Sequence, residues 1–375
     1  MIYLTYGDVD SPIYHSQVVG FCDFLREKME MEVQIVAFVP MRLYFAQKKK
    51  LAAYGKGIKV LPVVNRFQSN PWYSIFNAFL IKRMNPASIM TRNPAGLNVC
   101  REIQREEKPF FYDARGCQHM EMEEFSNADQ AAIQEMKQNE VQCFKKADWV
   151  FSVSGALIEY FKDNHRYKDH NHSIIPCCVL DTDYSKKLSK KELFGTEDVM
   201  VFCYAGALSV WNYPRSFHEL CKAILKNPKN RLVILSHDLE RLDGERLFEN
   251  ERVLLKKVES KEVTSYLGIS DYAILLRRSA VTNRVASPSK FGEYLMAGCQ
   301  VIISPEIGDF SEMVEKEELG IIYRGKKDND AIKSLKVTDE VTRARIKKLA
   351  EGTFNRDCEL NMIRYRNLKK LHDGK

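Results

Sequence analysis

What this 375-residue sequence lacks excludes whole classes of protein. No stretch approaches the roughly 18 uninterrupted apolar residues of a membrane-spanning helix, and the N-terminus has neither a basic segment nor an apolar run of signal-peptide length. The Gly-x-Gly-x-x-Gly turn of dinucleotide-binding oxidoreductases does not follow the first apolar run, and no P-loop motif occurs. We therefore expect a cytoplasmic protein that belongs to neither of these enzyme classes.

The ten cysteines contain no CxxC pair and no zinc-ribbon spacing. Most lie within apolar runs, as Cys203 does in Val201–Tyr204, so we expect reduced cysteines that pack as small apolar side chains. His170 and His172 form an isolated HxH in a polar stretch, and two ligands without further partners do not make a metal site. The sequence thus predicts no metal site and no cofactor.

Positive charge is concentrated in one part of the chain, whose net charge is +7. Between Val33 and Arg101 there are eleven lysines and arginines and no acidic residue, with large apolar residues interleaved. Such a surface attracts anions. Because no nucleic-acid reader motif is present, we expect an anionic membrane surface, on the inner face of the membrane, rather than nucleic acid. A soluble acceptor or a solvated basic surface is the alternative. The residues expected against lipid are Arg42, Lys48, Lys49, Lys50 and Lys82, with Leu43, Tyr44, Phe45, Trp72 and Tyr73 beside them.

Short apolar runs separated by helical segments predict an α/β protein of two Rossmann-like domains, each a doubly wound parallel sheet. We expect an N-terminal domain over residues 1–182, a linker over 183–197 and a C-terminal domain over 198–355. Residues 356–375 are expected to form a helix that returns to the first domain. Two such sheets facing each other would bind ligands in a cleft at the carboxyl ends of their strands. The predicted strands are Ile2–Tyr6, Val33–Val39, Gly57–Pro62, Ile89–Arg92, Phe110–Asp113, Trp149–Val153, Ile174–Pro176, Val199–Gly206, Arg231–Ser236, Val253–Leu255, Tyr272–Leu276 and Gln300–Ser304.

The stretch from Leu276 to Gly320 carries the clearest chemical signal. Ser287-Pro288 predicts a helix start, which places Lys290 in the first turn, where the helix dipole disfavours a cation. A phosphate arriving between the cation and the helix terminus would explain that placement. Glu293 follows one turn later on the same side and could accept the hydroxyl hydrogens of a ribose.

The rest of that stretch completes a loop–helix–strand–loop unit. Gly298 is expected to end the helix, and Gly308 and Asp309 follow the next strand, Asp309 as a helix N-cap. Arg277 and Arg278 stand at the carboxyl end of the preceding strand, with Arg284 a few residues on. Together these residues favour a site for an anionic ligand.

This segment resembles the donor-binding core of GT-B glycosyltransferases of the retaining family 4, in particular the branch found in bacterial capsule and O-antigen clusters. The matching residues are Lys290, Glu293-Tyr294-Leu295, Gly298, Val301-Ile302 and Gly308, with further patches at Tyr112–Gly116 with Glu121, at Ile175-Pro176 with Asp181, and at Tyr204–Leu208. The resemblance implies metal-independent transfer of a hexose, with retention, from a nucleotide diphosphate sugar to a glycan or lipid-linked acceptor. The implied catalytic residues are Arg278, Lys290 and Asp113, and the implied substrate-binding residues are Glu293, Arg215, Arg284, Ser289, Gly206, Gly308 and Arg115.

The chain departs from the family pattern at two places. The family's first glutamate is replaced by Val285, and a Lys-Gly pair is replaced by Trp211–Arg215, so that either Arg215 or Arg278 would supply the missing charge. A non-catalytic scaffold and a sugar-nucleotide epimerase on the same fold therefore stay open. Asp113 and Arg115 either face the acceptor or form a buried structural ion pair.

Overall fold

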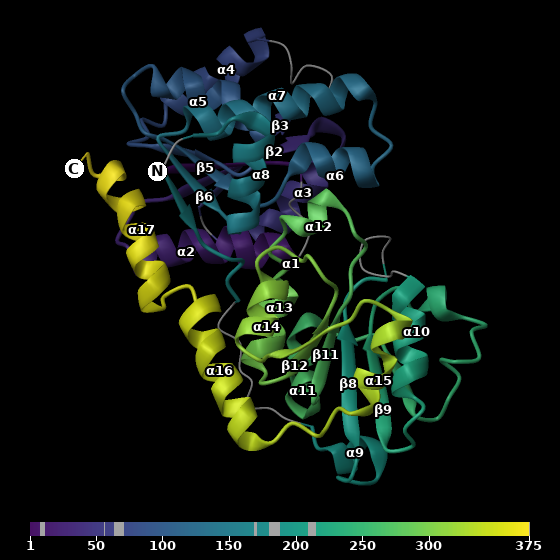
Figure 1. The fold of residues 1–375 in the computed structure, drawn as a ribbon. Coiled ribbons are helices and arrows are strands. Elements are labelled where there is room, and N and C mark those ends of the chain that lie inside the picture. Colours follow the sequence, from purple (N-terminus) through teal and green to yellow (C-terminus); the bar gives the residue numbers. More distant parts are fainter. Residues whose placement is uncertain are drawn as a thin grey trace. The chain divides into compact units, whose positions relative to one another are not determined.

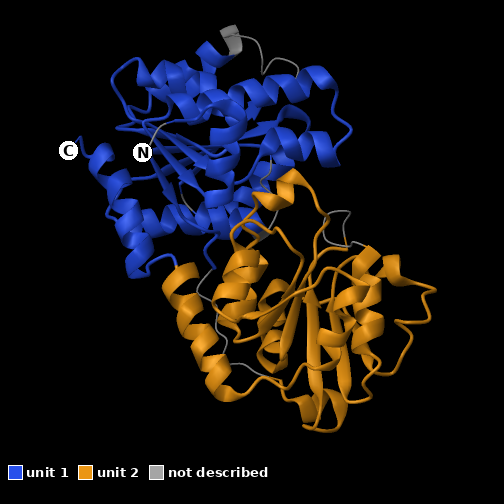
Figure 2. Cartoon of the chain, viewed as in Figure 1, with its two compact units in different colours: residues 1–180, 356–375 blue, residues 181–355 orange. Residues whose placement is uncertain are grey.

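The computed structural model describes residues 1–7, 12–55, 57–63, 71–168, 171–179, 188–208 and 215–374. The chain forms two compact units (Figure 2): unit 1 comprises Met1–Leu180 with Arg356–Lys375, and unit 2 comprises Asp181–Asn355. The C-terminal segment thus belongs to the unit that the N-terminus begins. Within the described residues, no helix is long and apolar enough to cross a membrane.

Unit 1 is built on a seven-stranded parallel sheet with the order β3-β2-β1-β4-β5-β6-β7. The order runs outward in both directions from β1 and β4, which makes their carboxyl ends the switch point where ligands bind in open α/β sheets. Most of the strands are short apolar runs, as a parallel sheet covered on both faces requires. The strands are β1 Ile2–Tyr6, β2 Gln34–Pro40, β3 Ile58–Val63, β4 Ile89–Thr91, β5 Phe110–Ala114, β6 Trp149–Ser152 and β7 His172–Ile174.

Helices cover both faces of this sheet (Figure 1). On one face α2 and the C-terminal helix α17 lie side by side, because the ring of Tyr365 packs 5.6 Å from Phe21 and 5.1 Å from Phe24. On the other face α7 packs on β5 through Phe144 and Tyr112. The helices are α1 Pro12–Tyr14, α2 Gly20–Glu27, α3 Tyr44–Ala52, α4 Pro71–Lys82, α5 Leu97–Gln104, α6 Gln118–Phe125, α7 Gln130–Lys146, α8 Gly155–His165 and α17 Glu359–His372.

Unit 2 repeats the plan with a six-stranded parallel sheet in the order β10-β9-β8-β11-β12-β13. Its strands are β8 Met200–Ala205, β9 Asn230–Leu235, β10 Val253–Lys256, β11 Tyr272–Leu275, β12 Gln300–Ile303 and β13 Gly320–Ile322. Its helices are α9 Lys190–Phe194, α10 Arg215–Ile224, α11 Ser260–Ile269, α12 Val281–Arg284, α13 Ser289–Met296, α14 Phe310–Lys316, α15 Asn329–Lys333 and α16 Glu340–Phe354. Strand β13 has no counterpart among the predicted strands, since three residues that begin with glycine give too weak a signal.

Three local expectations need correction. Helix α13 begins at Ser289 with Pro288 as its N-cap, one residue later than the Ser-Pro pattern predicts. Asp309 occupies the N-cap position of α14, but its side chain makes no capping hydrogen bond. The predicted linker contains helix α9, whose Lys190 donates to the buried Asp271 at 2.7 Å and so ties it to unit 2. The predictions on Asp181, His170 and Trp211–Pro214 lie outside the described residues.

Candidate functional site

Lys290 and Gly206 meet where β8 ends and α13 begins. Gly206 has a φ of +147°, and a Cβ atom placed there would lie 1.6 Å from the Nζ atom of Lys290. Any side chain at this position would therefore displace the ammonium group, and the positive φ disfavours a residue other than glycine. The same ammonium lies 5.7 Å from the centre of the Tyr204 ring, within cation–π range. The glycine thus lets the lysine lie directly on the end of the strand.

Tyr294 fixes α13 to the sheet beneath it. Its buried hydroxyl donates to the carbonyl of Ala205 at 3.2 Å and accepts from the backbone N–H of the same residue at 3.3 Å. The carbonyl of Ile274 lies 3.4 Å from this hydroxyl. Because β8 and β11 are both held, the first turn of α13 is placed at the carboxyl end of two neighbouring strands, where ligands bind in such sheets.

Lys290 and Glu293 lie near the start of α13, and both are half-buried. Burial lowers the pKa of Lys290 to about 8, with a smaller lowering from the charge of Arg277 and an opposing effect of Glu293. Burial raises the pKa of Glu293, against the charge of Lys290 and a hydrogen bond to Ser289. In the described part of the chain, Lys290 has no carboxylate within ion-pair distance. Both charges are therefore only partly compensated, which is the state of groups that await a ligand.

The two arginines that follow β11 have different surroundings. Arg277 is half-buried, and its guanidinium donates to the Oδ1 atom of the fully buried Asn283 at 3.0 Å. Arg278 is exposed, and its carbonyl accepts from the Nδ2 atom of the same asparagine at 2.9 Å. The sequence favoured Arg278, but the charge that acts on Lys290 is that of Arg277. A single buried asparagine, which sequence reasoning missed, thus holds the side chain of Arg277 and the backbone of Arg278.

The loop after β12 packs closely against the segment that precedes α13. Gly308 has a φ of +48°, and a Cβ atom there would lie 2.0 Å from the carbonyl oxygen of Ala286. Its backbone N–H donates to the carbonyl of Asn283 at 3.2 Å. Glycine is therefore required for the two loops to approach. Val285 is 3% exposed and belongs to the core.

The remaining unit 2 candidates are scattered around this group. Ser289 is the first residue of α13 and bonds to Glu293. Arg215 begins α10 and Arg284 ends α12, and both side chains are exposed. Among the described residues, neither arginine acts on the pKa of Lys290 or Glu293. The structure thus brings together Gly206, Arg277, Ser289, Lys290 and Glu293.

Asp113 and Arg115 lie at the carboxyl end of β5 in unit 1. The Asp113 carboxylate is buried and accepts from the guanidinium of Arg115 at 2.8 Å and from the hydroxyl of Tyr3. Arg92, at the end of β4, adds a second guanidinium 3.7 Å away. A carboxylate with these partners has little capacity left for a substrate. The geometry favours the structural ion pair over a catalytic role for Asp113.

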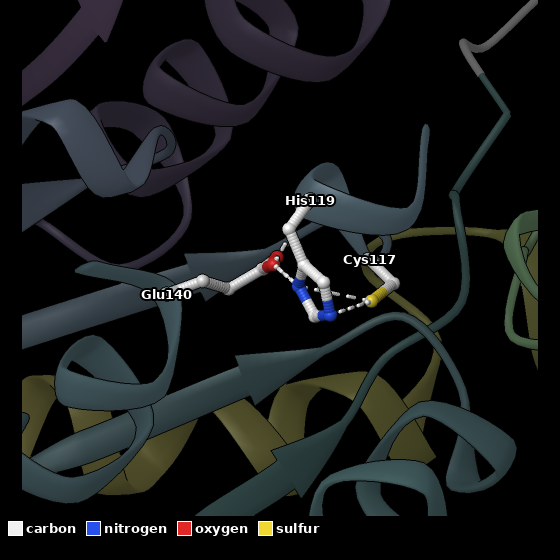
Figure 3. A group of neighbouring side chains, drawn as sticks. All are labelled: Cys117, His119 and Glu140. Atoms are coloured by element: carbon white, nitrogen blue, oxygen red, sulfur yellow. Dashed lines mark hydrogen bonds and ion pairs between the residues drawn. The ribbon is translucent and has the colours of Figure 1, made fainter. Parts of the chain in front are cut away.

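Cys117, His119 and Glu140 form a buried cluster that sequence reasoning missed (Figure 3). The Nδ1 atom of His119 lies 2.6 Å from Glu140 Oε2, and the Sγ atom of Cys117 lies 3.5 Å from the same nitrogen. Burial raises the pKa of the Cys117 thiol, and the Glu140 charge raises it further. A buried thiol without thiolate character is a poor nucleophile, so the cluster is not a catalytic triad. Its only sequence signal is the spacing Cys-x-His.

No family model matches the sequence. No curated protein matches it either. Solved structures do match over the full length. HepE of Anabaena, solved in complex with UDP, gives a TM-score of 0.70 at 15% identity, with 99% of each chain covered. WaaG, a glycosyltransferase involved in lipopolysaccharide biosynthesis, gives 0.65 at 10% identity, with 100% of each chain covered. The chain has the GT-B fold.

A third match is described by a different activity. A protein of Listeria monocytogenes described as a UDP-N-acetylglucosamine 2-epimerase gives a TM-score of 0.57 at 13% identity, with 100% of this chain and 96% of that chain covered. The GT-B fold thus houses more than one reaction on nucleotide sugars, and the activity must be argued from the site.

Proposed function

We propose that the chain is a glycosyltransferase that moves a hexose from a nucleotide diphosphate sugar to a glycan or lipid-linked acceptor. One observation carries the proposal: Lys290 lies over Gly206 at the start of α13, half-buried and without a carboxylate partner among the described residues. A buried, unpaired ammonium at the N-terminal end of a helix is matched by a phosphate group. The UDP complex of HepE, which shares this fold, supports a nucleotide as the ligand.

In this proposal different residues of unit 2 bind different parts of the donor. Lys290 and the first backbone N–H groups of α13 contact the diphosphate, and Arg277 adds positive charge beside them. Glu293 accepts hydrogen bonds from the ribose hydroxyls. As the bond to the sugar breaks, negative charge grows on the leaving diphosphate, and the preorganised cations stabilise it. The chemistry assigned to these side chains needs no metal ion, and the family resemblance favours retention at the transferred carbon.

Two alternatives are tested by the same assay. An epimerase would return a changed sugar still attached to its nucleotide, and the buried Val285 in place of a glutamate is the observation that favours a departure from transfer chemistry. A scaffold would bind the nucleotide sugar without turnover. A transferase releases free nucleoside diphosphate only when an acceptor is present.

The experiment starts from a panel of nucleotide diphosphate sugars screened by thermal shift, with UDP-hexoses first. The donor that raises the melting temperature of the wild-type protein is expected to have no such effect on Lys290→Ala and Glu293→Ala variants. Lys222→Ala, an exposed lysine of α10 in the same unit, is the matched control and should keep the shift. Equal shifts in all four proteins would refute the placement of the donor at α13.

We also propose that the acceptor is presented at an anionic membrane and that the segment Met41–Ala52 of unit 1 contacts it. Phe45 is 84% exposed and Met41 55% exposed, and Arg42, Lys48 and Lys49 are exposed beside them. Basic residues next to protruding apolar side chains match an anionic lipid surface. Helix α4 also exposes apolar residues, but its Lys82 pairs with Glu106 at 2.9 Å. Lys82 is therefore removed from the lipid-facing set that the sequence predicts.

A further inference from the structure

A group of metal-ligand side chains lies in unit 1, apart from the residues assigned to the donor. Cys117 precedes α6, His119 is in its first turn and Glu140 comes from α7. One ligand atom from each lies within 4.8 Å of the others, and the three residues are at most 1% exposed. Figure 3 shows the imidazole between the carboxylate and the thiol. The set offers sulfur, nitrogen and oxygen, the three donor types that zinc takes in proteins.

The distance between Cys117 and His119 fits a tetrahedral zinc ion, whereas the distance between His119 and Glu140 would have to increase. Zinc bond lengths of about 2.3 Å to sulfur and about 2.0–2.1 Å to nitrogen place two tetrahedral ligands about 3.5 Å apart. The Sγ atom of Cys117 and the Nδ1 atom of His119 are 3.5 Å apart. The contact between that Nδ1 and Glu140 Oε2, at 2.6 Å, is a hydrogen bond that would have to lengthen. A metal would take the place of the proton that this bond shares.

Two further observations point to a cation. Glu140 is a fully buried carboxylate, and among the described residues its ion pairs include no lysine or arginine, only His119. Buried charges are usually paired or bind metals. The second observation is His165, at the end of α8, whose ring centre lies 5.4 Å from that of His119. Its Nε2 atom is buried and has no hydrogen-bond partner, so a nitrogen is available as the fourth ligand.

We propose that Cys117, His119 and Glu140 bind a zinc ion that ties α6 to α7, with His165 completing the coordination after a side-chain rotation. The thiol ionises and releases one proton to solvent. The neutral imidazole moves its proton from Nδ1 to Nε2, where the hydroxyl of Tyr160 lies 3.3 Å away to accept it. A thiolate and a carboxylate then neutralise the two charges of zinc, so the buried site carries no net charge.

Glu140 also has a role without metal, and the experiment must separate the two. Its carboxylate accepts the backbone N–H of Gln118 at 2.9 Å and that of His119 at 3.2 Å, and so caps the start of α6. Each carboxylate oxygen has a further lone pair, so these bonds are compatible with a metal. A cluster that serves only as a cap binds no zinc, and metal analysis therefore distinguishes the two.

The test uses the full chain, purified under reducing conditions, loaded with zinc chloride and desalted. We expect one zinc per chain by mass spectrometry in the wild-type protein and in Cys143→Ser, a buried thiol of α7 outside the cluster. Cys117→Ser and His119→Gln should lose at least nine-tenths of it. Because these variants could fail to fold, cobalt is added to the wild-type protein as a second measurement. Thiolate-to-cobalt charge-transfer absorption supports the site, whereas its absence, or zinc no higher than in a desalted blank, overturns the proposal.

Discussion

Charged side chains stand at the carboxyl ends of strands in both units, but their surroundings are opposite. In unit 1 the buried Asp113 is bonded to Arg115 and Tyr3, with Arg92 nearby. In unit 2 Lys290 is half-buried with no described carboxylate in reach, and burial lowers its pKa to about 8. In the first arrangement the charges compensate one another, whereas the second carries a desolvation cost that a ligand can offset. Position at a strand end does not distinguish the two residues, whereas the degree to which their charge is compensated does.

A change at Asp113, the buried carboxylate that already has its partners, should have the largest effect. Asp113→Ala leaves two arginines without their buried carboxylate, and we expect the free energy of unfolding to fall by about 3–5 kcal/mol. Urea denaturation measures this loss. Tyr3→Phe removes one hydrogen bond only and should cost about 1 kcal/mol. If Asp113→Ala instead leaves stability near wild type and abolishes turnover, Asp113 is catalytic and our structural assignment is wrong.

Lys290→Met removes the partly compensated charge of unit 2, and it should lower activity without lowering stability. We expect turnover at saturating donor to fall roughly 100-fold or more, because the cation acts where charge develops in the transition state. The folded-state pKa of Lys290 lies below that of a free lysine, so its protonated form is penalised by folding at all pH values below about 8. Removing that charge should therefore raise the free energy of unfolding at pH 7, by about 1–3 kcal/mol.

The matched control for this variant is Lys222→Met, on the exposed surface of α10. It should alter neither the rate nor the stability by more than about 0.5 kcal/mol. A Lys290→Met protein that is both active and less stable than wild type would mean that the lysine is a structural residue.

The features that could be predicted from the sequence are those that depend on residues close together in the chain. Both sheets and most of the strands follow from short apolar runs with helical segments between them, since burial on both faces dictates that pattern. Strand β7, at His172–Ile174, shares only Ile174 with the predicted Ile174–Pro176. Lys290 and Glu293 could be placed because they lie on one helix, where spacing fixes the face, and Gly298 because a glycine with positive φ commonly follows a helix end. These are local properties, and local properties are readable from sequence.

Features that depend on contacts between distant segments were not readable. The sequence favoured Arg278, and no pattern in it marks the hydrogen bond between the guanidinium of Arg277 and Asn283. The carboxylate-free span from Val33 to Arg101 gains acidic partners from outside it, Glu106 for Lys82 and Asp113 for Arg92. Cys117 and Glu140 meet across 23 residues with no motif to mark them. Charge in a sequence predicts charge in a structure only where no later segment neutralises it.

Glu293→Gln tests the second partly compensated charge of unit 2. Burial raises the pKa of Glu293, so the ionised form is penalised by folding above the pKa of a free glutamate, and the amide should leave stability unchanged or higher. The loss of charged hydrogen bonds to ribose hydroxyls should weaken donor binding about 10- to 100-fold. Isothermal titration with the nucleoside diphosphate measures it. Unchanged affinity would place the ribose elsewhere.

The pH dependence of the donor reaction should report Lys290 directly. The ammonium is charged below its pKa of about 8 and neutral above it, so kcat/KM for the donor should fall several-fold as pH rises from 7 to 9. Lys290→Arg keeps its charge throughout this range, and its residual activity should be flat. A wild-type decline that persists in Lys290→Arg would come from another group.

The smallest expected effect concerns the exposed surface of unit 1. Phe45, Lys48 and Lys49 are exposed on α3, whereas Lys82 is paired with Glu106. Basic residues contribute about 1 kcal/mol each near an anionic membrane, so replacing Lys48 and Lys49 by glutamate should release the protein from anionic vesicles. The Lys82→Glu variant should stay bound, because α4 does not face the lipid in this proposal. Vesicle flotation measures both.

The lipid composition and the salt concentration decide what the surface recognises. Binding through charge should be absent with neutral vesicles and should weaken as salt shortens the Debye length from about 8 Å at physiological ionic strength. Phe45→Ser should reduce binding further by removing an apolar contact worth up to about 2 kcal/mol. Recovery with neutral vesicles equal to that with anionic ones, or no effect of the double glutamate change, would mean that the basic residues serve a soluble acceptor. Release by Lys82→Glu alone would show that α4, and not α3, faces the membrane.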